Sequence, residues 1–234
     1  MPLDPDKGGH VFISGKKGQG KSVLARRLFD TYPHDRLVLD VTGDLTADFV
    51  RDGLDFVKLT PDTLPLTFPR DHSGEGRPIT AVLAPDMGDE GTAMDQMDRA
   101  LGLALDHRRT LVWCDEVGSL TRAGKTPPNL RRALHHGRHR EIFLLLCGPR
   151  PVDVDPLCIS QADVVATFRT PNPRDRQRIA ENIGWPPSKF DAAVHGLGSH
   201  EYLWFDATDP EEQLLHMPPL PIGRRDLDLL EDED

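Results

Sequence analysis

The sequence predicts an α/β fold, in which a central and mostly parallel sheet is flanked by helices. Three observations support this prediction. Short apolar runs alternate along the chain with segments whose apolar residues recur at helical spacing. The most apolar run, residues 142–147, consists of five large apolar residues and one cysteine, as expected of a central strand that is covered on both faces. A glycine-rich loop joins the first apolar run to the first helical segment.

Each predicted element follows from the spacing of its apolar residues. Strands are predicted at residues 11–13, 37–39, 56–57, 79–83, 111–114, 142–147 and 164–168. Residues 202–205 and 214–217 are predicted to pair as a C-terminal antiparallel hairpin. Helices are predicted at residues 22–29, 93–104 and 129–137, and Asn172 followed by Pro173 is a typical helix start.

The composition indicates a single domain at residues 1–217 and a Pro-rich, acidic tail at residues 218–234. With a net charge of −10, the chain does not bind nucleic acid through its bulk charge, so any such contact needs a local basic surface. No apolar run approaches the roughly 18–20 residues of a membrane span, and we expect a cytoplasmic protein without membrane contact. Cys114, Cys147 and Cys158 are widely spaced and are predicted to be reduced thiols in the core.

The glycine-rich loop has a pattern that binds phosphate. Its sequence matches Gly-x-x-x-x-Gly-Lys-Ser, and it lies between a predicted strand and a predicted helix. Glycines let the backbone curl so that several N–H groups point at one anion, and the helix N-terminus adds positive potential. We predict that Lys21 reaches the β- and γ-phosphates and that Ser22 ligates Mg²⁺. The predicted nucleotide-binding residues are Gly15, Lys16, Lys17, Gly18, Gln19, Gly20, Lys21, Ser22 and Val23.

An acidic pair follows the predicted strand at residues 111–114. Asp115 is expected to hold the hydration shell of Mg²⁺, and Glu116 to polarise the attacking water. A carboxylate at this position favours hydrolysis, because a small-molecule kinase takes its nucleophile from the substrate. The alternative is an acidic pair that only caps a helix. Together with the loop, the pair predicts a P-loop NTPase fold of the ASCE, RecA-like type.

A turn after the second predicted strand bears on the choice of nucleotide. Residues 40–43, Asp-Val-Thr-Gly, match the Asp-x-x-Gly that GTPases use near the γ-phosphate, but no Asn-Lys-x-Asp guanine motif follows. We therefore predict ATP as the nucleotide. Asp40 is either a residue on the substrate side of the site or part of a simple strand-ending turn.

Four arginines precede the predicted central strand: Arg131, Arg132, Arg138 and Arg140. An arginine there, expected close to the catalytic edge of the sheet, is a candidate to meet the γ-phosphate of a neighbouring subunit. The alternatives are a solvated basic helix face and a surface that contacts nucleic-acid phosphates.

From about residue 11 to residue 168 the chain resembles the FtsK/HerA superfamily of DNA-pumping ATPases, which includes viral genome-packaging ATPases. Besides the two motifs above, the resemblance rests on Gly137-Arg138, Pro149-Arg150-Pro151, Phe168-Arg169 and residues 40–44, 152–155 and 159–163. It implies a ring oligomer, a hexamer or a pentamer, that threads double-stranded DNA with the energy of ATP hydrolysis. By position, Arg138 would be the trans-acting arginine, with Arg140 as the second choice, and Asp40 and Arg150 are candidates for a sensing or coupling role.

The chain departs from the family at one position. The family usually carries glutamine immediately before Arg-Pro, where it senses the γ-phosphate, and this chain carries Pro149. The sequence therefore predicts a DNA-translocating or packaging ATPase, phage-encoded or from a mobile element, acting in the host cytoplasm with a portal or other assembly protein as a further partner. The alternative is a regulatory or assembly ATPase that acts on a protein partner without pumping DNA.

Overall fold

The computed structural model describes residues 8–71, 76–209, 211 and 213–221. Its strands are β1 (Gly9–Ser14), β2 (Asp35–Leu39), β3 (Val57–Leu59), β4 (Thr80–Leu83), β5 (Thr110–Cys114), β6 (Phe143–Gly148), β7 (Val164–Phe168), β8 (Tyr202–Asp206) and β9 (Leu214–Met217). They form one sheet in the order β3-β4-β2-β5-β6-β1-β7-β8-β9. The pairings from β3 to β7 are parallel, and those of β7 with β8 and of β8 with β9 are antiparallel. The mostly parallel sheet and the C-terminal hairpin are thus confirmed.

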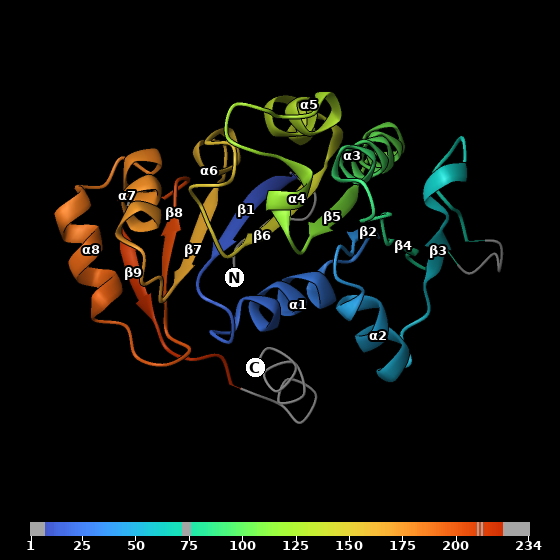
Figure 1. Cartoon of the computed structure of the whole chain (residues 1–234). Helices are drawn as coiled ribbons and strands as arrows, with labels where there is room; N and C mark the ends of the chain where they lie inside the picture. Colours follow the sequence, from blue (N-terminus) through green and yellow to red (C-terminus); the bar gives the residue numbers. More distant parts are fainter. Residues whose placement is uncertain (1–7, 72–75, 210, 212, 222–234) are drawn as a thin grey trace.

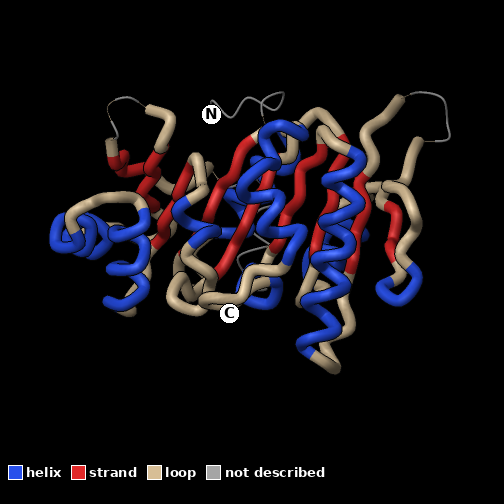
Figure 2. Tube along the Cα trace, turned by 90° about the horizontal axis from the view of Figure 1, so that it is seen from above, coloured by secondary structure: helices blue, strands red, loops and turns tan. Residues whose placement is uncertain are grey.

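The helices are α1 (Lys21–Thr31), α2 (Asp44–Arg51), α3 (Glu90–His107), α4 (Val117–Leu120), α5 (Pro128–His136), α6 (Leu157–Ser160), α7 (Pro173–Asn182) and α8 (Pro187–His195), with 3₁₀ turns η1 (Pro61–Thr63) and η2 (Gly137–Arg140). α1 and α2 cover one face of the sheet, and α3 and α5 cover the other (Figure 1). Seen from above, the long α3 lies over this second face and runs roughly along the strands (Figure 2).

Alternation along the strands gives each face its own core. On β1, Val11 and Ile13 pack with α1 and α2, whereas Phe12 packs with the helices of the opposite face. Trp113 of β5 points to the α1 side, where its ring lies 5.5 Å from that of Phe29. Because side chains on a strand alternate between the two faces, both helical layers are held by the same strands.

The central strand β6 lies between β1 and β5, and every residue of it is buried. One strand therefore separates the strand before the glycine-rich loop from the strand before the acidic pair. In a parallel sheet the carboxyl ends of all these strands meet at one edge, and this brings the two motifs together. We call this the carboxyl edge, and the opposite one the amino edge.

Four of the described helices were not predicted from the sequence: α2, α8 and the four-residue helices α4 and α6. α2 is eight residues long, and α8 follows two consecutive prolines, so neither has the long apolar repeat by which α3 was recognised. The predicted start of α7 is confirmed, since Asn172 is its N-cap and its side chain accepts a hydrogen bond from the N–H of Arg174. The three cysteines are buried and unpaired, as predicted.

The tail predicted at residues 218–234 falls mostly outside the described residues, which end at residue 221. Its first part is not free of the domain, because Leu220 packs against the core on the α1 side. Arg27 of α1 also donates a hydrogen bond to the carbonyl oxygen of Pro221. None of the helices in the described parts of the chain combines the length and the apolar character needed to cross a bilayer.

Candidate nucleotide-binding site

The glycine-rich loop turns from the end of β1 into α1, where the sequence placed it. Gly15, Gly18 and Gly20 have φ angles of 149°, 75° and 99°, which side chains rarely tolerate. At Gly15 the close approach is as important as the angle, because a Cβ there would lie 2.5 Å from the Cβ of Phe168 at the end of β7. The N–H of Lys16 donates to the carbonyl oxygen of Arg169 over 3.0 Å. The loop is thus held against the carboxyl end of β7.

The side chain of Lys21 folds back onto the glycine-rich loop. Its residue is only 8% exposed, and its Nζ donates to the carbonyl oxygen of Lys16 over 3.3 Å. A lysine in this position can exchange its carbonyl contact for the oxygens of a phosphate. Ser22 follows in the first turn of α1, where the N–H groups of the helix end have no partner within the helix.

Both predicted motifs line one cavity of about 320 Å³ at the carboxyl edge. Its lining includes Lys21 and Ser22 from the loop and Asp115 and Glu116 from the acidic pair. The remaining lining residues are Lys17, Thr42, Asp44, Leu45, Asp48 and Pro149. A cation, a hydroxyl and two carboxylates therefore converge on a space suited to phosphate and a hard metal ion.

The side chain of Glu116 does not cap the helix that follows it. Glu116 occupies the N-cap position of α4, but its side chain makes no capping hydrogen bond. Burial raises the pKa of the Glu116 carboxyl, and the charge of Lys21 opposes this shift. A carboxylate with a raised pKa is a stronger base, which suits a group that takes a proton from water.

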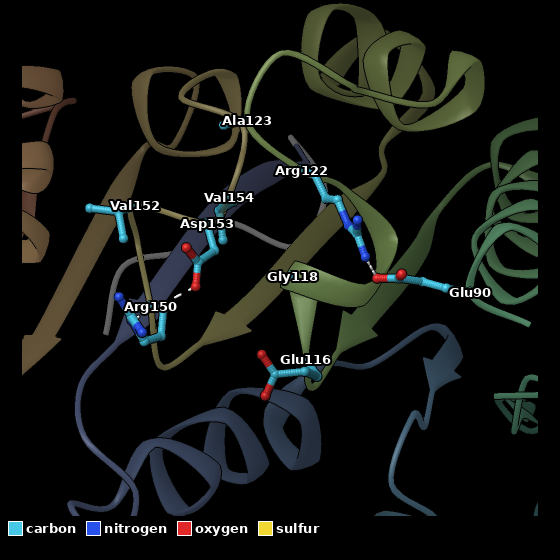
Figure 3. Close-up of a pocket in the computed structure, with 9 residues that line it drawn as sticks. All are labelled: Glu90, Glu116, Gly118, Arg122, Ala123, Arg150, Val152, Asp153 and Val154. Atoms are coloured by element: carbon cyan, nitrogen blue, oxygen red, sulfur yellow. Dashed lines mark ion pairs between the residues drawn. The ribbon is translucent and has the colours of Figure 1, made fainter. Parts of the chain in front are cut away.

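A second cavity, of about 560 Å³, lies beyond Glu116 and is drawn in Figure 3. Glu116 lines both cavities, whereas Arg150 and Arg122 line only the second. The Nε of Arg150 lies 3.7 Å from a carboxylate oxygen of Asp153 and 3.7 Å from one of Asp175. Arg150 is thus held near two carboxylates in a cavity that Glu116 also lines.

The position at which the sequence analysis expected a sensor glutamine and found Pro149 lies at the first cavity. Pro149 follows β6 and lines the first cavity together with Lys21 and Glu116. Its side chain offers no hydrogen-bonding group. The neighbouring Gly148 is tightly packed, since a Cβ there would lie 3.0 Å from Cγ1 of Val117.

The aspartate of the turn after β2 forms hydrogen bonds within the turn itself. Asp40 is fully buried and accepts hydrogen bonds from the N–H groups of Gly43 (3.0 Å) and Thr46 (2.8 Å). These contacts fix the start of α2 and correspond to the strand-ending turn, which was one of the two interpretations of the sequence. They disfavour a direct contact of Asp40 with a nucleotide. The residues of this turn that line the first cavity are Thr42 and Asp44.

The predicted place of the arginines near the catalytic edge is wrong. Arg138 and Arg140 lie in η2, which precedes β6, and β6 runs parallel to β1 with Phe143 opposite Gly9. They therefore lie at the amino edge, and the phosphate loop lies at the carboxyl edge. Arg138 is paired with the buried Asp163, and Arg140 donates to the carbonyl oxygen of Leu105 over 3.1 Å. Neither can reach the phosphate loop of its own subunit.

The amino edge also carries basic residues that the sequence did not single out. Arg108 and Arg109 have φ angles of 70° and 47°, and Glu141 in the adjoining loop has a φ of 56°. The Nε of Arg109 donates to Glu141 over 2.9 Å, and Arg108 donates to the carbonyl oxygen of His139 over 3.1 Å. Positive φ angles at successive non-glycine residues are uncommon and cluster at functional sites. No pattern in the sequence predicts these left-handed backbone angles.

No protein-family model matches this chain, and no curated protein sequence matches it either. Solved structures do resemble it in fold. The genome-packaging NTPase B204 from Sulfolobus turreted icosahedral virus 2, in complex with AMP, matches with a TM-score of 0.69 at 17% identity, over 94% of this chain and 100% of that one.

Two further structures match at lower similarity. The pCW3 conjugation coupling protein TcpA, with ATPγS, matches with a TM-score of 0.52 at 14% identity, over 92% of this chain and 61% of that one. EccC of Thermomonospora curvata matches with a TM-score of 0.56 at 11% identity, over 99% of this chain and 42% of that one. The chain therefore shares its fold with these nucleotide-hydrolysing proteins, and the predicted P-loop ATPase fold is confirmed.

Proposed function

We propose that this chain hydrolyses ATP with Mg²⁺ and couples the hydrolysis to the translocation or packaging of double-stranded DNA by a ring-shaped homo-oligomer. The observation that carries the proposal is the cavity at the carboxyl edge that brings Lys21, Ser22, Asp115 and Glu116 together. The fold it shares with a genome-packaging NTPase and a conjugation coupling protein supports the DNA part of the proposal.

The residues of the cavity fit both ATP and Mg²⁺. The Ser22 hydroxyl and the Asp115 carboxylate offer the oxygen ligands that Mg²⁺ prefers, and they line the same cavity as Lys21. When bound, the ion would neutralise charge on the β- and γ-phosphates. Lys21 holds the phosphate chain, and Glu116 orients the attacking water and takes its proton.

Two variants separate binding from hydrolysis. Lys21→Ala is expected to abolish turnover and weaken ATP binding, because the loop loses its cation. Glu116→Gln is expected to bind ATP with the affinity of the wild type while phosphate release falls by about 10²–10⁴-fold, the usual contribution of a general base. Lys58→Ala removes an exposed lysine on β3 and serves as the control. A Glu116→Gln protein that turns over at the rate of the wild type would show that Glu116 is not the base.

In the ring we assign Arg138 to the nucleotide of a neighbouring subunit, with Arg140 as the second choice. The position of both residues at the amino edge supports a contact between subunits, because the phosphate loop of the same subunit is at the opposite edge. Arg138→Ala should therefore lower turnover in the assembled ring, whereas Arg131→Ala, which removes an exposed arginine on α5, should not.

A mixing experiment tests the trans contact directly. Arg138→Ala subunits retain Glu116, and Glu116→Gln subunits retain Arg138, so a mixed ring contains interfaces that hold both groups. The mixture is expected to recover part of the activity that neither variant shows alone. Without such recovery, Arg138 does not act on a neighbouring nucleotide and only stabilises the fold through Asp163. Native mass spectrometry with ATP and DNA decides between a pentamer and a hexamer.

Binding of double-stranded DNA needs a local basic surface, and the exposed turn at residues 122–125 offers Lys125 together with Arg122, which is ion-paired with Glu90. Arg122 and Lys125 are exposed, and their backbones pair across the turn. ATPase activity is expected to rise with double-stranded DNA and to lose this stimulation as salt increases. Lys125→Ala should reduce the stimulation and leave the rate without DNA unchanged. An ATPase that no length of DNA stimulates would contradict the DNA part of the proposal.

One observation favours the alternative, a regulatory or assembly ATPase that acts on a protein partner. Pro149 lines the cavity without a polar side-chain group, at the position where the family that the sequence resembles usually carries a γ-phosphate-sensing glutamine, so that glutamine's contact is not available here. A rate that responds to a portal or other assembly protein and not to DNA would select this alternative.

A further inference from the structure

The fold defines two sides of the phosphate loop. The cavity with Lys21, Asp115 and Glu116 lies on the side of β5 and receives the γ-phosphate end of the nucleotide. In the sheet order β5-β6-β1-β7-β8, the strands on the other side of the loop are β7 and β8. Because a triphosphate is a linear chain, the nucleoside of the same molecule lies on the β7–β8 side.

One side chain from the β8 side approaches the loop closely. A Cβ at Gly20, the N-cap of α1, would lie 3.5 Å from Cε1 of Phe168 and 3.8 Å from Nδ1 of His200. His200 precedes β8 by two residues, far from the loop in sequence. The pairing of β8 with β7 brings it to the start of α1.

Two polar atoms at this place are buried without a hydrogen-bond partner among the described residues. They are Nδ1 of His200 and Oε1 of Gln19, which immediately precedes Gly20. Buried polar groups in folded proteins are nearly always hydrogen-bonded, so a pair of unsatisfied atoms that flank the same glycine calls for a partner outside the chain. An imidazole and a carboxamide can each donate and accept a hydrogen bond, as the base and ribose of a nucleoside can.

The backbone of His200 supports the same conclusion. Its φ angle is 61°, a left-handed conformation that is uncommon for a residue other than glycine and that aims its ring at the loop. Such strain is retained where the position of the side chain has a use.

We propose that His200 and Gln19 form the nucleoside-binding part of the site and contact the base and ribose of the bound nucleoside triphosphate. This inference rests on the proposed ATPase function; it adds His200, which neither phosphate motif contains, and gives the side chain of the loop residue Gln19 a role toward the nucleoside. It predicts that the two side chains contribute to the binding of ATP but not to the binding of inorganic tripolyphosphate, which fills the phosphate loop and lacks a nucleoside.

The test compares the affinities of the full-length protein for MgATP and for Mg-tripolyphosphate, measured by calorimetry. His200→Gly removes the ring and tolerates the positive φ angle, and His200→Asn tolerates the angle while keeping a polar group. Gln19→Ala removes the second group. The control is His195→Ala on α8, where the side chain is 61% exposed. Thermal unfolding of each variant verifies that it is folded.

We expect His200→Gly and Gln19→Ala each to weaken ATP binding about fivefold to tenfold, as the loss of a hydrogen bond to a ligand does, with tripolyphosphate binding unchanged. His200→Asn should retain more ATP affinity than His200→Gly. Equal weakening of both ligands would mean that the residues only shape the loop and would overturn the inference, as would no weakening of either. If the wild type binds tripolyphosphate but not ATP, the proposed ATPase function itself fails, and this outcome is distinct from the others.

Discussion

The contact between the phosphate loop and β7 makes a sharp prediction for Gly15→Ala. The new Cβ would lie 2.5 Å from Cβ, 3.2 Å from Cα and 3.3 Å from the carbonyl carbon of Phe168. Carbon atoms pack at about 3.5–4.0 Å, so the shortest contact is too close by about 1 Å or more. All three atoms belong to the backbone or are fixed to it. A rotation of the Phe168 ring therefore cannot relieve the clash, and the loop has to move.

The cost has two parts. Alanine at the φ of 149° is strained whatever its surroundings, by about 1–3 kcal/mol, and overpacking adds about 1–3 kcal/mol. Gly53→Ala is the matched control, because Gly53 also has a positive φ, of 68°, but its Cβ would meet nothing within 4 Å. Urea denaturation should therefore show Gly15→Ala to be less stable than Gly53→Ala by about 1–3 kcal/mol.

The clash should also be visible in function. A loop displaced by about 1 Å no longer aims its N–H groups at the phosphates, and misplacement on this scale can lower turnover by about 10²-fold. Phe168→Ala in the Gly15→Ala background should restore neither property, since it leaves the clashing atoms in place. The reasoning is refuted if Gly15→Ala matches Gly53→Ala in stability and binds ATP with the affinity of the wild type, or if Phe168→Ala rescues it.

Three further outcomes follow from buried groups. Burial raises the pKa of Glu116, so the acid limb of the ATPase pH profile should lie above 4.5, the ordinary glutamate value. The folded state should lose stability relative to Glu116→Gln as pH rises through this limb, because the buried carboxyl is more stable in its protonated form. An acid limb at or below 4.5 would contradict the prediction. Asp40→Ala leaves two N–H groups at the start of α2 without their acceptor. It should lower the free energy of unfolding, measured by urea titration, by about 1–3 kcal/mol. An unchanged urea midpoint would refute this expectation. Burial raises the pKa of Cys114, Cys147 and Cys158, the last to about 12. Ellman's reagent should therefore label all three thiols only after unfolding. One fast-reacting thiol in the folded protein would disprove their burial.

The elements that the sequence predicted are those whose apolar pattern is local. β6 and α3 carry long apolar repeats, and both lie where the sequence placed them. The phosphate loop and the acidic pair are also local patterns, and their convergence in one cavity follows from the rule that parallel strands share a carboxyl edge. α2 was missed because its start depends on one buried carboxylate, that of Asp40, and not on a repeat.

The misplaced arginines and the unpredicted His200 differ in how far the sequence could have located them. Arg138 was placed near the phosphate loop because it is close to the central strand in sequence, yet a residue that precedes a parallel strand lies at the opposite edge from a loop that follows one. The sequence contained this information, since it already predicted a parallel sheet. The two edges of the sheet are separated by the length of a strand, and β1, with six residues, is roughly 20 Å long. A role for Arg138 in hydrolysis therefore requires a second subunit.

His200 could not have been found in the same way. Its approach to Gly20 requires β8 to turn back antiparallel beside β7, and its left-handed backbone has no signature in the sequence, where histidine is followed by an ordinary glutamate. The phosphate end of the site is built from contiguous motifs because several N–H groups of one loop must converge on one anion. The nucleoside end needs only single side chains, and these can come from any neighbouring element. Only the folded structure therefore shows which residues lie close enough to contact the nucleoside.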